Sequence, residues 1–385
     1  DGLARTPSGM KGVRRKDFLF ANDSWFRGIC VKCGPDGALY VSDWCDTGEC
    51  HNYDKCDITN GRIYRVSYGD PKQWKGDVSK LTDAELVTMT VFAKNEWFSR
   101  KARRVLQERA SEKKLEDGTI KALRKELNAK HDPPYLLRAM WALAVTGHLT
   151  VSEVIPFLKS EADVVRGWGY RFIIDGRELV WDDGSGKQLE RSIKTLVEEE
   201  ESPYVLLSIA SAYQRNGAGT LALGELIRKP HLGTDPKLVQ MVWYAIERSG
   251  KSFIGNVDVI LNANHPLLRQ NMVRAQFARY ANSPDRFEGV LLRLRQAQSP
   301  DVQFDILVVI HETLAGTKSV AMPKSWPELY TKLLKSDRKD VLRESEAVAV
   351  LFGDKEAIAK LSRVVSDSRA TAPDRVAAIE LLRPL

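Results

Sequence analysis

All five cysteines of this 385-residue chain lie within one short stretch, and the remaining sequence has none. They are Cys30, Cys33, Cys45, Cys50 and Cys56. Clustered cysteines are typical of disulfide bridges or of a metal site. Disulfides would place this part of the protein outside the cytosol, with two bridges and one thiol left over. Cys56 would then pair with Cys45 or Cys50 across a long loop, whereas a bridge between Cys30 and Cys33 would be tight.

The alternative to disulfides is that the cysteines bind a zinc ion. Cys30, Cys33, Cys45 and Cys50, with His51 beside them, supply the sulfur and nitrogen ligands that a tetrahedral zinc site needs. Against this, residues three apart on a strand face opposite sides, and Cys30 and Cys33 fall where a strand is expected. Reduced structural thiols remain a third interpretation. His51 follows Glu49 and Cys50, so it is a candidate for a catalytic role or a metal-ligand role. A histidine in a loop usually has neither role.

Acidic side chains crowd the same stretch and suggest a calcium site. They are Asp43, Asp46, Glu49, Asp54 and Asp57. Carboxylate oxygens are the ligands that Ca²⁺ prefers, and Gly48 permits a tight loop, so we predict Asp43, Asp46 and Glu49 as candidate ligands. The spacing is not that of an EF-hand, and helix capping, Asx turns or solvation explain such residues more often.

Two further groups are candidates for binding other molecules. Arg100, Arg103 and Arg104 belong to a basic predicted helix that could dock on an acidic surface, or form a solvated face paired with Glu96 and Glu108. Trp168 lies in an Arg- and Gly-rich segment, 166–172, that we interpret as a loop inserted between helices or as a contact patch for a ligand or a neighbouring domain.

The elements that hold the cysteines and acidic residues read as strands. Residues 25–31, 38–43 and 61–68 are rich in aromatic and β-branched residues, and Gly34-Pro35-Asp36-Gly37 has the chemistry of a turn between the first two. Residues 1–24 predict an irregular lead-in with one edge strand. Strand, turn, strand, long loop and strand together match one blade of a β-propeller.

From Leu81 onward the hydrophobic period becomes helical. Thr82 and Glu85 have capping-box spacing. Prolines mark further helix starts at Pro134, Pro203, Pro236, Pro266 and Pro300, and the last four are separated by 33, 30 and 34 residues. Apolar residues recur six, nine and ten positions after each proline, with only Gln276 breaking the pattern. A period in the low thirties predicts an α-solenoid of HEAT or armadillo type, with about nine units.

The sequence resembles a known family at two blocks. GPDGALYVSDW followed by GRIYRV resembles the last blade of quinoprotein sugar dehydrogenase propellers. DWCDTGECH, GRIYRVSYG and NEWFSRKARRVLQERA resemble bacterial membrane-bound dehydrogenases, which join a propeller to HEAT-like repeats and a c-type haem module. The resemblance implies PQQ and haem c, bound mostly by parts outside this chain. Only one blade is present, and Gly34 follows Cys33 where a haem motif needs His.

Composition and termini narrow the possible functions. The net charge of +7 is spread along the predicted helices, and no nucleic-acid module is recognisable, so we expect no nucleic-acid binding. No apolar run is long enough to span a bilayer. The chain opens on Asp1-Gly2, and its last predicted helix lacks a polar cap, so we expect a portion of a larger protein.

The sequence therefore predicts an α+β, multi-domain, extracytoplasmic protein. Residues 1–75 would form a terminal propeller blade with a cysteine-rich loop, and residues 76–385 a HEAT-like helical array. We expect a scaffold that binds a protein partner on the array and the rest of a propeller on the sheet. No nucleophile elbow, phosphate loop or H-E-x-x-H motif occurs. The alternative function is part of a quinone- and haem-linked sugar dehydrogenase.

Overall fold

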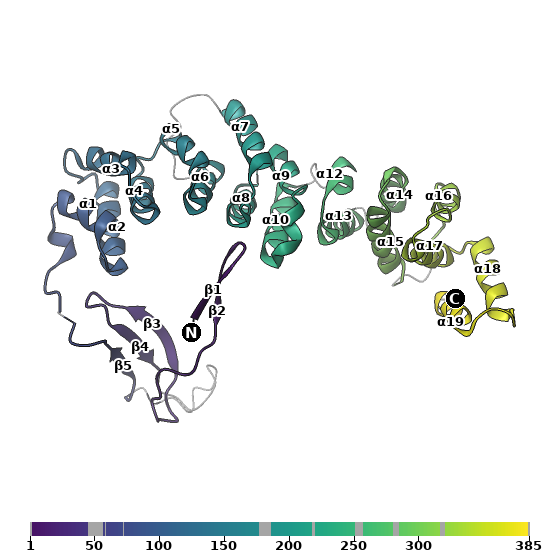
Figure 1. Ribbon diagram of the computed structural model, residues 1–385, viewed down its shortest axis with the longest axis horizontal. Coiled ribbons are helices and arrows are strands. Elements are labelled where there is room, and N and C mark those ends of the chain that lie inside the picture. Colours follow the sequence, from purple (N-terminus) through teal and green to yellow (C-terminus); the bar gives the residue numbers. More distant parts are fainter. Residues whose placement is uncertain are drawn as a thin grey trace. The chain divides into compact units, whose positions relative to one another are not determined.

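Antiparallel strands occupy the N-terminal part of the chain, and helices follow through the remainder (Figure 1). The computed structural model describes residues 2–44, 57, 59–71, 73–176, 186–217, 220–250, 257–279, 285–315 and 320–383. The chain divides into two compact units, Asp1–Gly184 and Ser185–Leu385. This arrangement is an α+β fold in which a small sheet precedes many helices.

The three predicted strands form one antiparallel sheet. Its strands are β3 (Gly28–Cys33), β4 (Leu39–Asp43) and β5 (Arg62–Val66), in the order β3-β4-β5. The first strand begins later than predicted because the Asp23 carboxylate and carbonyl accept hydrogen bonds from the backbone of Trp25 and Phe26, which closes a turn there. Val31 pairs with Val41, which in turn pairs with Tyr64.

The predicted turn between β3 and β4 is confirmed. Gly37 has a φ of 78°, which glycine adopts without strain, and its amide donates to the Gly34 carbonyl at 3.0 Å. The Asp36 carboxylate accepts the amide of Ala38 at 3.1 Å, as turn-forming aspartates do.

The N-terminal lead-in is more ordered than the sequence suggests. Strands β1 (Gly2–Thr6) and β2 (Gly9–Val13) form a two-stranded antiparallel hairpin, with Pro7-Ser8 as its turn. The prediction of an irregular segment with one edge strand is therefore wrong. The hairpin was missed because its Gly- and Lys-containing strands lack the alternation of a half-buried strand and remain largely exposed.

Helices of the first unit pack in successive pairs. They are α1 (Asp83–Phe92), α2 (Glu96–Ser111), α3 (Thr119–Asn128), α4 (Pro133–Val145), α5 (Val151–Val154) and α6 (Asp163–Asp175), with 3-10 turns η2 (Val78–Lys80) and η3 (Ile155–Lys159). Helix α1 packs on α2, α3 on α4, and η3 on α6, while α2 contacts α4 and α4 contacts α6. Thr82 and Glu85 form the predicted capping box at the start of α1.

A buried carboxylate joins the first helices. Asp83 is 1% exposed and accepts hydrogen bonds from the Glu116 amide at 2.8 Å and the Thr119 hydroxyl at 2.6 Å. Arg109, at the end of α2, donates to the same carboxylate. Burial raises the pKa of Asp83, but the bonds from Thr119, Glu116 and Arg109 together hold it below its ordinary value. The carboxylate therefore stays charged and fastens α2 and α3 to the start of α1.

The second unit also consists of packed helices. Its helices are α7 (Gly186–Glu199), α8 (Pro203–Asn216), α9 (Thr220–Leu226), α10 (Pro236–Ser249), α12 (Val257–Asn262), α13 (Pro266–Arg279), α14 (Arg286–Gln296), α15 (Pro300–Ala315), α16 (Trp326–Leu333), α17 (Lys339–Leu351), α18 (Lys355–Ser366) and α19 (Ala372–Leu382), with the 3-10 turn η4 (Pro230–Thr234). Helix α8 packs on α10, α10 on α13, α13 on α15, and α15 on α17.

The proline signals mark true helix starts. Pro203, Pro236, Pro266 and Pro300 are each the first residue of a helix, where the missing N–H costs nothing. Pro134 is the second residue of α4. The residues of the predicted apolar faces are buried, except Ala275, which is half-exposed. Gln276, the one polar residue in the predicted pattern, is buried as well.

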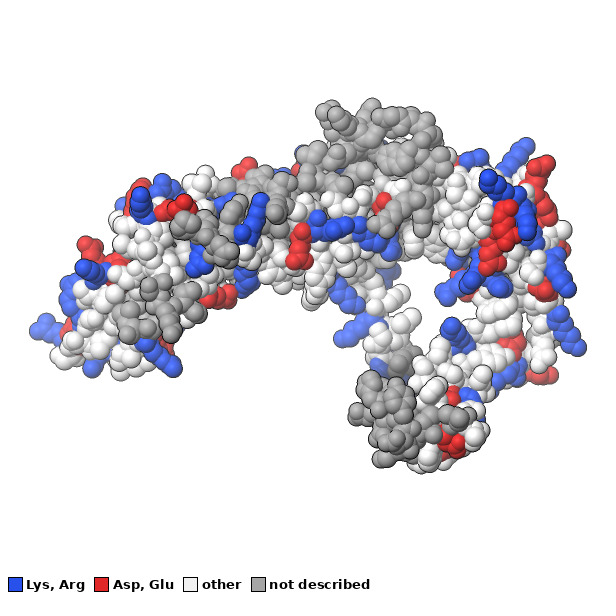
Figure 2. Space-filling view, turned by 180° about the vertical axis from the view of Figure 1, so that it is seen from behind, with Lys and Arg blue, Asp and Glu red and all other residues white. Residues whose placement is uncertain are grey.

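Basic and acidic side chains are interspersed over the helices on the face that Figure 2 shows. Within the described residues, no helix has the length and apolar character needed to cross a membrane.

Candidate interaction surface

The cysteine cluster is only partly within the described residues. Cys30 and Cys33 lie on β3 as exposed free thiols, so the tight bridge between them is not formed. The reason is the strand itself, which turns residues three apart to opposite sides. Cys45, Cys50, Cys56 and the neighbouring His51 lie outside the described residues. A bridge among those three cysteines, or a zinc site, stays a prediction.

Asp43, the first predicted calcium ligand, is occupied by hydrogen bonds within the sheet. Its carboxylate accepts the Arg27 amide at 2.8 Å and Nε of Arg62 at 3.2 Å. Arg62 also bonds Asp23, and this bond holds the pKa of Asp23 below its ordinary value. Asp46 and Glu49 lie outside the described residues. Among those described, no group of three or more His, Cys, Asp or Glu side chains is placed to hold a metal ion.

One side chain connects the sheet to the helices. Asn95 caps α2 by accepting the Trp97 amide at 2.9 Å. Its amide nitrogen donates to the carbonyls of Gly34 at 2.9 Å and Pro35 at 3.2 Å. The turn between β3 and β4 is thereby held against the start of α2.

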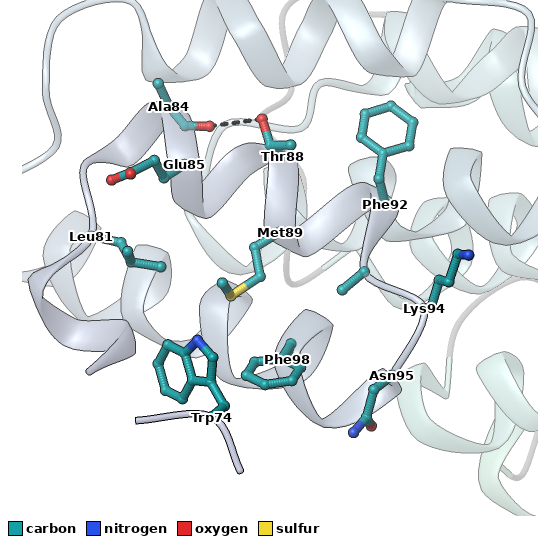
Figure 3. A pocket seen from close by; sticks show the side chains of 11 residues that line it. Trp74, Leu81, Ala84, Glu85, Thr88, Met89, Phe92, Lys94, Asn95 and Phe98 are labelled. Atoms are coloured by element: carbon teal, nitrogen blue, oxygen red, sulfur yellow. Dashed lines mark hydrogen bonds between the residues drawn. The ribbon is translucent and has the colours of Figure 1, made fainter. Parts of the chain in front are cut away.

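An open apolar groove of about 830 Å³ lies beside the same helix start (Figure 3). Trp74, Met89 and Phe98 point toward one another along it, and the Trp74 and Phe98 rings meet edge to face at 5.2 Å. Glu85 and Lys94 also line it. No sequence pattern indicates this groove, because Trp74 lies between β5 and η2 and is brought to α1 and α2 only by folding.

Two arginines and two tryptophans form a continuous row across α2, α4 and α6. The Arg103 guanidinium lies 5.2 Å from the ring centre of Trp141, and Trp141 meets Trp168 edge to face at 5.1 Å. Arg171 lies 4.6 Å from the ring centre of Trp168. We call these four side chains the Arg–Trp row. All four are half-buried, so each keeps some surface open to solvent.

Around Arg103, at one end of the Arg–Trp row, arginine side chains outnumber carboxylates. Glu96 pairs with Arg138 at 2.5 Å and with Arg100 at 3.5 Å. Within the described residues no carboxylate lies at ion-pair distance from Arg103, and its buried Nη1 has no hydrogen-bond partner. Burial lowers the pKa of Arg103, Glu96 raises it, and the charges of Arg100 and Arg138 lower it further.

The predicted interaction residues therefore fall into two groups. Arg103 and Trp168 come together through Trp141, and Arg100 adjoins them through Glu96. Arg104 instead pairs with Glu108 at 2.9 Å on an exposed face. Trp141 was missed, although its place in MWALAV, between two predicted core positions, is the signal that it borders the core.

The segment around Trp168 is helical, so its interpretation as an inserted loop is wrong for residues 166–175. Close packing explains one of its glycines, Gly169. A Cβ added at Gly169 would come within 3.1 Å of the Leu158 side chain, so glycine lets η3 approach α6 closely. The predicted acidic residues and Trp181 that follow lie outside the described residues.

Comparisons with known proteins give one match to a family model. Residues 3–70 match a domain of unknown function, DUF7133, which spans both small sheets and ends before α1. No curated protein matches the chain. Among solved structures, an engineered protein whose crystal structure comes from the Northeast Structural Genomics Consortium is similar to this chain, with 15% sequence identity and a TM-score of 0.27. The match covers 79% of this chain and 99% of the engineered protein. The likeness to the domain is thus confined to the sheet region, and the Arg–Trp row lies beyond it.

Proposed function

We propose that this chain is a protein-binding scaffold of an extracytoplasmic protein. In this proposal, residues 76–385 form an α-solenoid of HEAT- or armadillo-like repeats, joined to a terminal propeller blade in residues 1–75. The pairwise packing of helices supports the solenoid, as do the proline-started helices spaced 33, 30 and 34 residues apart. The three-stranded sheet at the predicted positions supports the blade.

The observation that carries the binding role is the Arg–Trp row. Trp and Arg are the residue types most enriched where protein partners bind tightly. Here one side chain of each of α2 and α4, and two of α6, meet in one line, so three helices contribute to one half-buried surface. Consecutive repeats that each add residues to a shared surface are how helical arrays bind extended partners.

The uncovered sheet favours a second candidate. Strand β3 and strand β5 are both edges of their sheet, and Ile29, Val31 and Ile63 are 69%, 62% and 75% exposed. An apolar sheet needs another layer or neighbouring blades to cover it. This supports a blade that completes a propeller supplied by another segment or chain. By family resemblance, that propeller would be part of a quinone- and haem-linked sugar dehydrogenase, with PQQ and haem c on the other parts.

Photocrosslinking tests the scaffold role without knowledge of the partner. Benzoylphenylalanine placed at Trp141 of the full chain should form a covalent adduct with another protein in producing cells. The same group at Arg104, on the exposed face of α2, is the matched control and should form none. Adducts at neither position, or at both equally, would contradict the proposal.

An activity assay separates the second candidate. The parent protein is given sugars and a redox dye, with and without added PQQ and Ca²⁺. Quinone-dependent turnover would favour the dehydrogenase, and absence of turnover under every condition would remove it.

A further inference from the structure

We infer that the Arg–Trp row binds an acidic peptide segment of the protein partner, an inference that rests on the scaffold role proposed above. Its first support is charge. Arg100, Arg103 and Arg138 surround a single carboxylate, Glu96, which already bonds two of them. A carboxylate brought by a partner would balance the remaining charge in a half-buried place, where ion pairs are less screened than on an open surface.

The second support is the state of the Arg103 guanidinium. A guanidinium has five N–H donors arranged to bind carboxylates in pairs. In the described part of the chain, Nη1 of Arg103 has no acceptor, and Nε1 of Trp141, beneath the same guanidinium, has none either. Buried donors without acceptors are costly, so a small shift of these side chains toward an incoming carboxylate is favoured.

The third support concerns which acidic polymer fits. Sugars and nucleobases bind tryptophan by stacking on its open faces. Here Arg103 already covers one face of Trp141, and Arg171 covers one face of Trp168. The rings also meet each other edge to face. With one face of each ring covered by a guanidinium, the row has fewer open ring faces for stacking and adds cationic N–H groups, which suits Asp and Glu side chains with apolar neighbours.

Fluorescence anisotropy on the full chain tests the inference. The probe is a fluorescein-labelled deca-glutamate peptide, with labelled deca-lysine and oligogalacturonate as comparisons. Deca-glutamate should bind more tightly than either, and its affinity should fall as NaCl is raised, since the pairs are electrostatic. Arg103→Gln should weaken binding about tenfold, as expected for the loss of one charge-assisted pair.

The matched control is Arg104→Gln, which changes the adjacent arginine of α2 but lies outside the row. Its affinity should equal that of the unchanged chain. Arg103→Lys keeps the charge but loses the paired donors, and should lie between the two. Circular dichroism confirms that each variant is folded. If Arg103→Gln does not fold, Trp168→Phe takes its place. This variant keeps an aromatic ring but changes the ring on which Arg171 packs, and it should weaken binding severalfold.

Four results would overturn the inference: no binding of deca-glutamate, salt-independent binding, equal loss in Arg104→Gln, or tighter binding of oligogalacturonate through Arg103. These outcomes differ from failure of the scaffold role. Adducts at Trp141 without deca-glutamate binding would leave the scaffold standing and remove only the acidic partner.

Discussion

At the scale of single residues, buried charge pairs connect helices that are far apart in sequence. Arg269 on α13 pairs with Asp305 on α15 at 2.5 Å, and both side chains are almost fully buried. Arg269 also donates to the Ala263 carbonyl at 2.8 Å, and Gln270 donates to Asp305 at 2.8 Å. Removing one partner from such a pair leaves an uncompensated buried charge, which costs far more than removing both.

Replacing Asp305 by Ala should therefore lower the free energy of unfolding by about 3–5 kcal/mol, because Arg269 is left buried without its carboxylate. The double variant Arg269→Met, Asp305→Leu should lose much less, since two apolar side chains can pack together there. Urea unfolding followed by circular dichroism measures both. A single variant within about 1 kcal/mol of the unchanged chain would show that the pair is not buried in solution.

At the scale of elements, the sequence predicted helix starts and buried faces well. Proline has a fixed φ and no N–H, so Pro203, Pro236, Pro266 and Pro300 could be placed at helix starts from local chemistry alone. The glycines of α6 could not be understood in that way. Gly169 costs helix propensity, and its close approach to Leu158 explains why a residue without a side chain stands there. The same limit applies to the Arg–Trp row, because its members meet only when three helices stack.

The capping box of α1 gives a direct element-scale prediction. Thr82 accepts the Glu85 amide at 3.3 Å, and the Glu85 carboxylate accepts the Thr82 amide at 2.8 Å. Thr82→Ala should cost about 1 kcal/mol of stability, because the Glu85 amide loses its acceptor and the Glu85 carboxylate loses the bond from the Thr82 hydroxyl. Thr88→Ala, further along the exposed face of α1, is the control and should change stability by less than about 0.5 kcal/mol. Equal effects in thermal unfolding would argue against the cap.

A histidine bridge makes one helix contact depend on pH. Nδ1 of His311 on α15 lies 2.8 Å from the Glu344 carboxylate on α17. This bond raises the pKa of His311 above 6.5, with Glu312 adding to the rise and Arg343 opposing it. A raised pKa in the folded state means that the folded protein binds more protons, so stability is greatest below 6.5 and falls as pH rises through the folded value.

His311→Gln should therefore flatten the stability profile between mildly acidic and mildly alkaline pH. Because His311 is more than a third exposed, the effect should be no more than about 1 kcal/mol. Arg295→Gln removes a comparable pair between α14 and α16 without a histidine, so its profile should keep the slope. An unchanged slope in His311→Gln would show that the bridge does not form.

At the scale of the whole molecule, the helices and the small sheet differ in how far their apolar side chains are buried. The helices cover one another's apolar faces, as α8 with α10 and α13 with α15. Within the described residues, the sheet of β3, β4 and β5 has no further strand at either edge and carries exposed apolar side chains, which favours the covering partner proposed above. The hydrophobic periodicity of the sequence indicated the helices, whereas the exposure of the sheet became visible only in three dimensions.

Hydrogen–deuterium exchange of the full chain, read by mass spectrometry, tests this division most directly. Amides of α8, α10, α13 and α15 should exchange slower by orders of magnitude than those of β3 and β5, because only the helices are buried by neighbours. A covering propeller partner, as proposed above, should slow exchange in the strands and leave the helices unchanged. Strands as protected as the helices in the isolated chain, or helices that exchange as fast as the strands, would contradict it.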